Sequence, residues 1–179
     1  MGDGRPFAAA VNFAPRHVAA TSRNVRVAAH ELGHALGFGR TPFSLFHMVS
    51  EVPNVRGMSK VSAISTPKTK AMARQYHNRH TLEGVELEDE GGSTSALSHW
   101  KKRNMRDELM TSDAGVGLYS ALTLAALEDM GVYKANRSAA EMLRWGNNSG
   151  CWLLGKKCLT DGIAEYPDLF RNHAHACRI

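Results

Sequence analysis

Two histidines stand four residues apart in the stretch His30-Glu31-Leu32-Gly33-His34, with a glutamate directly after the first. Residues four apart lie above one another on an α-helix, so both imidazoles face one point, as a tetrahedral zinc site requires. Glu31 lies about 100° round the helix from His30, which places its carboxylate beside a metal-bound water rather than on the metal. The spacing predicts a hydrolytic zinc site.

A catalytic zinc site needs a third protein ligand and one open position. In the shortest pattern of this type the third histidine would stand three residues after Gly37, but that position is Arg40. Spacing alone leaves the choice open among a downstream glutamate and the remaining histidines, which are His47, His77, His80, His99, His173 and His175. The alternative is that His30 and His34 are surface residues of a helix that binds no metal.

The helix that must carry the motif is predicted to begin near Ser22, which can cap it. Apolar residues recur at helical spacing on one side of it, at Val25, Ala28, Leu32, Ala35 and Leu36. Gly37 and Gly39 are expected to end it, because glycine tolerates the left-handed conformation found past helix ends. Ahead of it, the apolar residues Pro6–Asn12 predict a buried strand that Pro15 terminates.

Further elements are expected downstream. Apolar and turn-forming residues predict a short strand at Val61–Ile64, a helix from Thr66 and Pro67 to about Tyr76, and a helix from about Ser120 to Met130 that Gly131 ends. Residues 91–95 are interpreted as a flexible turn and residues 146–150 as a loop, and the tail from Asp161 is expected to be irregular.

Separated motifs in the chain resemble the leishmanolysin family of surface metalloproteases. The resemblance rests on His30–Phe38, residues 87–92, Ser98-His99-Trp100, Asp107-Glu108-Leu109-Met110, and residues 125–131 with continued similarity to Cys158. Members of this family are metzincins in which a long insertion separates the helix glycine from the third histidine. The resemblance implies an α+β fold with a metzincin-like core: an active-site helix, a partial upper sheet, and a mostly irregular or helical lower subdomain.

The resemblance also assigns roles to residues. It implies that His99 is the third zinc ligand and that Met110 is the Met-turn residue packed beneath the metal. It implies one Zn²⁺ per chain, Glu31 as the general base, and protein or peptide substrates. We expect one catalytic region, with residues 1–37 as a partial N-terminal subdomain, 38–98 as the insertion and 99–179 as a truncated lower subdomain.

Some features depart from the family pattern. Leishmanolysins are secreted or anchored at the cell surface and rich in disulfides, whereas this chain shows no signal peptide or anchor signal and has three cysteines. Arg79 stands where the family typically has a cysteine. Cys151 and Cys158 could pair with each other or with absent partners, and Cys177 is unassigned. By resemblance we expect a cell-surface or extracellular location, and a fragment of a longer protein.

Only one predicted strand precedes the helix, so the edge strand along which metzincins usually bind peptide is expected to be missing. This favours an alternative function, in which the chain is a catalytically weak or inactive remnant that acts as a cell-surface adhesion or binding module.

Composition excludes other classes of protein. The chain has 179 residues, a length that suits one domain, and its net charge is +5. Its densest basic cluster, residues 101–106, lies between acidic residues, so we interpret it as a solvated surface and expect no nucleic-acid partner. Its apolar runs are far shorter than the roughly 20 residues that cross a bilayer, so no transmembrane segment is expected.

Overall fold

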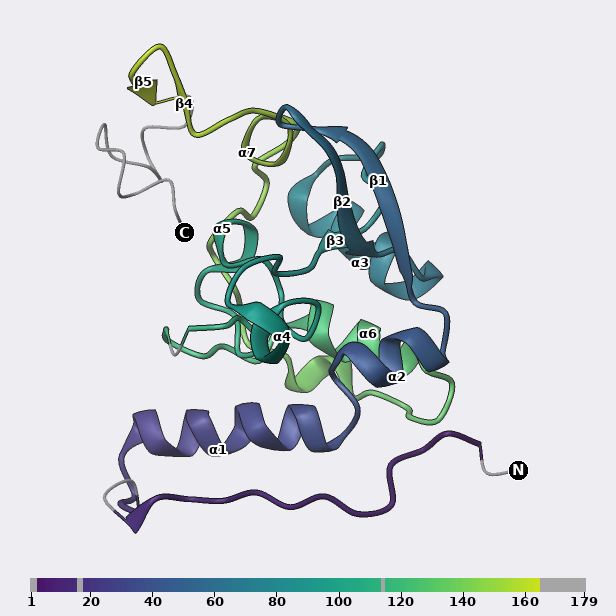
Figure 1. The fold of residues 1–179 in the computed structure, drawn as a ribbon, viewed down its shortest axis with the longest axis vertical. Helices are drawn as coiled ribbons and strands as arrows, with labels where there is room; N and C mark the ends of the chain where they lie inside the picture. Colours follow the sequence, from purple (N-terminus) through teal and green to yellow (C-terminus); the bar gives the residue numbers. More distant parts are fainter. Residues whose placement is uncertain (1–2, 16–17, 114, 165–179) are drawn as a thin grey trace.

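The computed structural model describes residues 3–15, 18–113 and 115–164, which form helices and small antiparallel sheets in an α+β arrangement (Figure 1). The elements in chain order are α1 (Ser22–Ala35), α2 (Arg40–Leu45), β1 (Val49–Val55), β2 (Met58–Ile64), α3 (Pro67–His77), β3 (Val85–Glu86), α4 (Gly92–Ser95), α5 (Lys102–Met105), α6 (Ala121–Asp129), the 3-10 helix η2 (Arg137–Ala139), α7 (Trp152–Gly155), β4 (Leu159–Thr160) and β5 (Ile163–Ala164). In this part of the chain, no helix is long and apolar enough to cross a membrane.

The larger sheet has the order β1-β2-β3 with antiparallel pairing throughout. Val49 pairs with Ile64 at one end of the hairpin and Val55 with Met58 at the other. Arg56 and Gly57 both have positive φ, as a tight turn between twisted strands requires. The predicted strand at 61–64 is confirmed as part of β2, while β1 was not predicted.

Helices α3 and α6 pack together, and both contribute residues to the core. The Asp129 carboxylate at the end of α6 accepts the backbone N–H groups of Lys68 and Thr69 at 3.1 and 2.8 Å, which caps α3. Both predicted helices are confirmed, and Ser120 caps α6 through its side chain. The largest fully buried side chains of the core include Trp100, Phe38, Phe43, Met48, Met105, Met110, Leu122 and Leu153.

The predicted buried strand at Pro6–Asn12 is wrong. These residues form no strand with any described segment, and the Phe7 side chain is fully exposed. A strand exists only where a neighbour satisfies its backbone N–H and C=O groups, and in the described residues none lies beside this segment. Figure 1 draws the segment below α1, with the other elements above that helix.

Three smaller expectations also need correction. The residue that caps α1 is Thr21 rather than Ser22, and its hydroxyl accepts the Asn24 N–H at 3.2 Å. Residues 91–95 are not a flexible turn, because Gly92–Ser95 form the short helix α4 and Gly91 is its N-cap residue. The tail from Asp161 is not irregular at its start, because Ile163–Ala164 form β5 and pair with β4, which directly precedes the tail, while residues 165–179 lie outside the described residues.

Candidate metal centre

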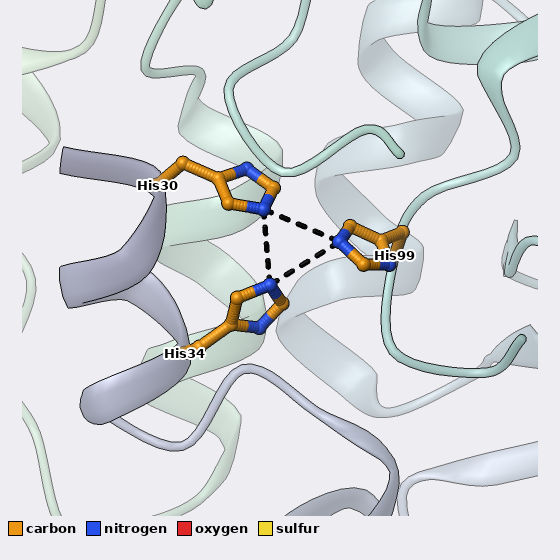
Figure 2. Close-up of side chains that lie close together, drawn as sticks. All are labelled: His30, His34 and His99. Atoms are coloured by element: carbon orange, nitrogen blue, oxygen red, sulfur yellow. Dashed lines mark hydrogen bonds between the residues drawn. The ribbon is translucent and has the colours of Figure 1, made fainter. Parts of the chain in front are cut away.

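Three histidines from two distant segments meet at one point. His30 and His34 project from the same face of α1, and His99 approaches from the segment after α4 (Figure 2). The His34 Nε2 atom lies 3.0 Å from that of His30 and 3.2 Å from that of His99, and the third separation is 3.2 Å. Zinc–nitrogen bonds of about 2.0–2.1 Å in a tetrahedron hold such atoms about 3.3 Å apart. The triangle therefore has the size of a zinc site.

Each ring is oriented by a backbone carbonyl at its other nitrogen. His30 Nδ1 donates to Leu109 O at 2.6 Å and His34 Nδ1 to Phe38 O at 2.6 Å. His99 Nδ1 lies 3.1 Å from Ser95 O and 3.0 Å from the Ser98 hydroxyl, which itself donates to Ser95 O. A carbonyl only accepts, so the proton lies on Nδ1 and each Nε2 lone pair faces the shared point. Three converging lone pairs fit a cation, and the donor set of three neutral imidazoles suits zinc.

Burial favours the neutral form of two of these rings, those of His30 and His99. Desolvation lowers the pKa of His99 to about 4, with the His34 and His30 rings adding to the effect. Desolvation also lowers the pKa of His30, against the opposing effect of its bond to Leu109. Because a metal binds the unprotonated nitrogen, both shifts leave the ligands ready for a metal at neutral pH.

Gly37 shapes the end of α1. It has φ of +106°, and its N–H donates to His34 O at 2.9 Å. This left-handed turn returns the chain so that the Phe38 N–H donates to Gly33 O at 3.0 Å, while the Phe38 carbonyl meets the His34 ring. A glycine is needed there because L side chains rarely adopt this φ.

The segment that carries His99 is fixed to the stretch 87–90. The Glu88 N–H donates to His99 O at 2.9 Å, and the Leu97 N–H donates to Glu88 O at 2.8 Å. The Glu88 side chain is buried and pairs with Lys101 Nζ at 2.7 Å. A residue 65 positions beyond His34 thus reaches the two helical histidines.

Met110 lies against the inner surface of α1. Its side chain is fully buried, and a Cβ built on Gly33 would overlap Met110 Sδ. Met110 therefore packs on α1 at Gly33, which lies between His30 and His34 in the sequence. The preceding residue, Leu109, supplies the carbonyl that holds His30.

Glu31 lies on α1 at the edge of a pocket of about 180 Å³. The pocket is also lined by His30, by Arg26 on the same helix, and by residues of the loop after α5, among them Leu109, Thr111 and Asp113. Glu31 is partly exposed, so its carboxylate can meet a molecule bound beside the histidines.

The other candidate histidines lie away from this point. His77 is buried, with Nδ1 2.9 Å from Gly146 O, and desolvation lowers its pKa to about 4. His47 follows α2 and His80 is exposed. His173 and His175 lie outside the described residues. Within the described ranges, His30, His34 and His99 are the group of side chains able to hold a metal ion.

Sequence reasoning missed the groups that orient the ligands. The carbonyls of Leu109, Phe38 and Ser95 leave no mark in side-chain patterns, because any residue can supply a carbonyl. It also gave no role to the buried Glu108, although the stretch 107–110 was part of the resemblance. Cys151 and Cys158 form no disulfide with a described residue, and Cys177 lies outside these ranges.

Comparison with known proteins agrees with these observations. The family model described as Leishmanolysin matches residues 1–178. The leishmanolysin of Leishmania major is 41% identical over 177 residues, which cover 97% of this chain and 29% of that protein. A leishmanolysin homolog of Crithidia fasciculata is 42% identical over 82% of the chain, and a leishmanolysin-like peptidase of Drosophila melanogaster is 31% identical over 86%. The chain spans less than a third of the length of these relatives.

Proposed function

Because the chain belongs to the leishmanolysin family, we propose that it forms the catalytic region of a zinc-dependent metalloendopeptidase. The observation that carries the proposal is the triangle of Nε2 atoms of His30, His34 and His99, 3.0 to 3.2 Å apart, each with its Nδ1 bound to a carbonyl. In this proposal residues 1–37 carry the active-site helix, 38–98 are an insertion, and 99–179 belong to the lower part of a metzincin-like core.

The reaction is hydrolysis of a peptide bond. When bound, zinc lowers the pKa of a water toward about 7 and polarises a carbonyl. Glu31 stands one residue from His30 and faces the pocket, so its carboxylate accepts the proton of the attacking water. It then gives that proton to the departing amine, as a general base that becomes a general acid.

The protein's other groups hold this arrangement rigid. The carbonyls at Nδ1 fix the three rings, and Met110 closes the site from below against Gly33. The pocket of about 180 Å³ beside Glu31 is a place for a side chain of the peptide substrate. By family, the location we propose is the cell surface or the extracellular space.

A second candidate function has an observation in its favour. Residues 6–12 form no strand with a described neighbour, so the described residues ahead of α1 provide no sheet edge that could align a peptide. This favours a chain that keeps the metal site but cleaves weakly or not at all by itself, and serves as a binding module at the cell surface.

Metal analysis and peptide turnover test both candidates. We expect about one zinc per chain, lost on His99→Ala, because two ligands hold the metal far less tightly than three. Glu31→Gln is the matched control, since it keeps the shape of the side chain and all three ligands. It should retain zinc and lose about 100-fold or more of any peptidase activity.

The outcomes separate the candidates. Turnover by the parent chain that Glu31→Gln abolishes supports the peptidase. Zinc binding with no turnover supports the binding module. A parent chain that binds no zinc rejects both, because each rests on the three histidines.

A further inference from the structure

Glu108 is a fully buried carboxylate to which the reaction gives no role. It stands two residues before Met110, in the loop between α5 and α6. Its hydrogen-bond partners in the described residues are two backbone N–H groups and two hydroxyls, all neutral. A buried carboxylate loses its hydration, so it persists only where such donors replace water.

One oxygen of Glu108 holds the loop that touches the metal centre. Oε2 accepts the Met110 N–H at 2.5 Å. A second hydrogen bond holds the same loop, because the Leu109 N–H donates to Leu118 O at 2.8 Å. The carboxylate therefore turns the chain at the point where Leu109 and Met110 face α1.

The other oxygen of Glu108 binds the start of α6. Oε1 accepts the Ser120 hydroxyl at 2.7 Å and the Ser120 N–H at 3.3 Å, and it also accepts the Thr123 hydroxyl. Thr123 in turn accepts the Trp100 indole N–H at 2.8 Å. Helix α6 is part of the packed core, so it provides a fixed base for the loop.

This loop contacts His30 directly, and it contacts the sequence neighbours of His34 and His99. The Leu109 carbonyl accepts from His30 Nδ1 at 2.6 Å, and Met110 packs on Gly33 between His30 and His34. The Met110 carbonyl accepts the Trp100 N–H at 2.9 Å, directly after His99. Displacement of residues 109–110 would therefore change both the ring of His30 and the position of His99.

We propose that Glu108 is a positioning residue of the metal centre: its carboxylate fastens Leu109 and Met110 to the start of α6 and so sets the geometry in which His30, His34 and His99 bind zinc. The inference rests on the proposed function, since it needs a metal at these histidines. Outer groups that orient metal ligands typically change metal affinity by about 10- to 100-fold when removed.

The chemistry of the side chain explains why a glutamate stands here. An ionised carboxylate only accepts, and every group that faces it can donate. Alanine leaves the Met110 N–H without a partner. Glutamine keeps one carbonyl oxygen but turns an amide NH₂ toward donors, so it should hold the loop less well than glutamate and better than alanine.

The test compares Glu108→Ala and Glu108→Gln with the parent chain, with zinc affinity measured by competition with a chromophoric chelator. A second readout is the visible absorption spectrum of the Co²⁺-loaded chain, which reports ligand geometry and which a change in fold stability alone does not move. We expect about a 10-fold or greater loss of zinc affinity in Glu108→Ala, an altered cobalt spectrum, and an intermediate effect in Glu108→Gln.

Leu122→Ala is the matched control. Leu122 is buried in α6, so its loss destabilises the same helix but removes no hydrogen bond to the Glu108 carboxylate. It should keep the parent zinc affinity and cobalt spectrum. A folded Glu108→Ala chain with both parent properties overturns the proposal, as does a Leu122→Ala chain that loses zinc equally. Where Glu108→Ala does not fold, parent values in Glu108→Gln overturn it. A parent chain without zinc rejects the proposed function itself.

Discussion

The two faces of α1 differ sharply in how they are used. The inner face, made of Ala29, His30, Gly33 and His34, points at the rest of the molecule, and Gly33 is buried under Met110. The outer face, made of Val25, Leu32 and Leu36, is the apolar one, yet these side chains are 58%, 57% and 41% exposed. The face with fewer apolar atoms is the packed one.

The two faces of α1 therefore have different roles. On the inner face, glycine and histidine allow close approach of the loop 108–111 and of His99, and hydrogen bonds to carbonyls fix the rings. On the outer face, apolar periodicity forms an amphipathic helix, but within the described residues these apolar side chains stay largely exposed. Amphipathicity therefore predicts that a helix forms, but not which face meets the core.

The largest effect expected from this comparison is at Phe38, just beyond α1. Its ring is fully buried between Phe43 and Trp100, with ring centroids 4.9 Å away in each case. Phe38→Ala should lower the free energy of unfolding by about 3–5 kcal/mol, through lost transfer energy and a cavity. Denaturant unfolding monitored by circular dichroism measures it. A loss of less than about 1 kcal/mol would contradict the burial of Phe38 between Phe43 and Trp100.

The pH dependence of the free energy of unfolding tests whether His77 is buried in the folded chain. Desolvation, aided by Arg79, lowers its pKa from 6.5 to about 4 in the folded chain, and the bond to Gly146 and the charge of Glu86 oppose this. Between these values the unfolded chain binds the extra proton. The stability that His77 contributes is therefore complete above pH 6.5 and is lost as the pH falls toward 4.

The expected loss from this group is about 3 kcal/mol. Denaturant unfolding of metal-free protein at pH 7 and pH 4 measures it, with His77→Asn as the control, because Asn keeps an N–H donor and does not titrate there. An equal loss of unfolding free energy between pH 7 and pH 4 in the two chains would show that His77 is not the cause.

Gly33→Ala probes the close approach on the inner face. The added Cβ would overlap Met110 Sδ, so the buried methionine must move, which costs about 1–3 kcal/mol of unfolding free energy. Zinc affinity should fall as well, because Met110 follows Leu109, the partner of His30. Gly39→Ala is the control, since its Cβ meets nothing within 4 Å and its φ is extended. Equal stability of both variants would place Met110 elsewhere.

The smallest effect belongs to the outer face. Leu32→Ala should change the free energy of unfolding of this chain by no more than about 0.5 kcal/mol, because an exposed side chain buries little on folding. Thermal and denaturant unfolding both measure this. If the loss reached 2 kcal/mol, the outer face would be covered in solution, and the contrast between the faces would fail.

Local sequence accounts for several elements. The helices at 67–77 and 121–129 follow from Pro67, Ser120 and apolar spacing, because caps and periodicity act within a few residues. The strand at 6–12 failed for the opposite reason. Its apolar residues suit a strand, but pairing depends on a neighbour that its own sequence does not specify.

For the candidate site, the spacing of His30, Glu31 and His34 is enough to bring two imidazoles to one point, because helix geometry is local. Family resemblance, rather than spacing, selected His99 and Met110. The tertiary structure decided which carbonyls orient the rings, that Gly33 receives Met110, and that Glu108 ties the loop to α6. These contacts join residues far apart in the chain, and such contacts depend on how the whole chain packs rather than on any local pattern.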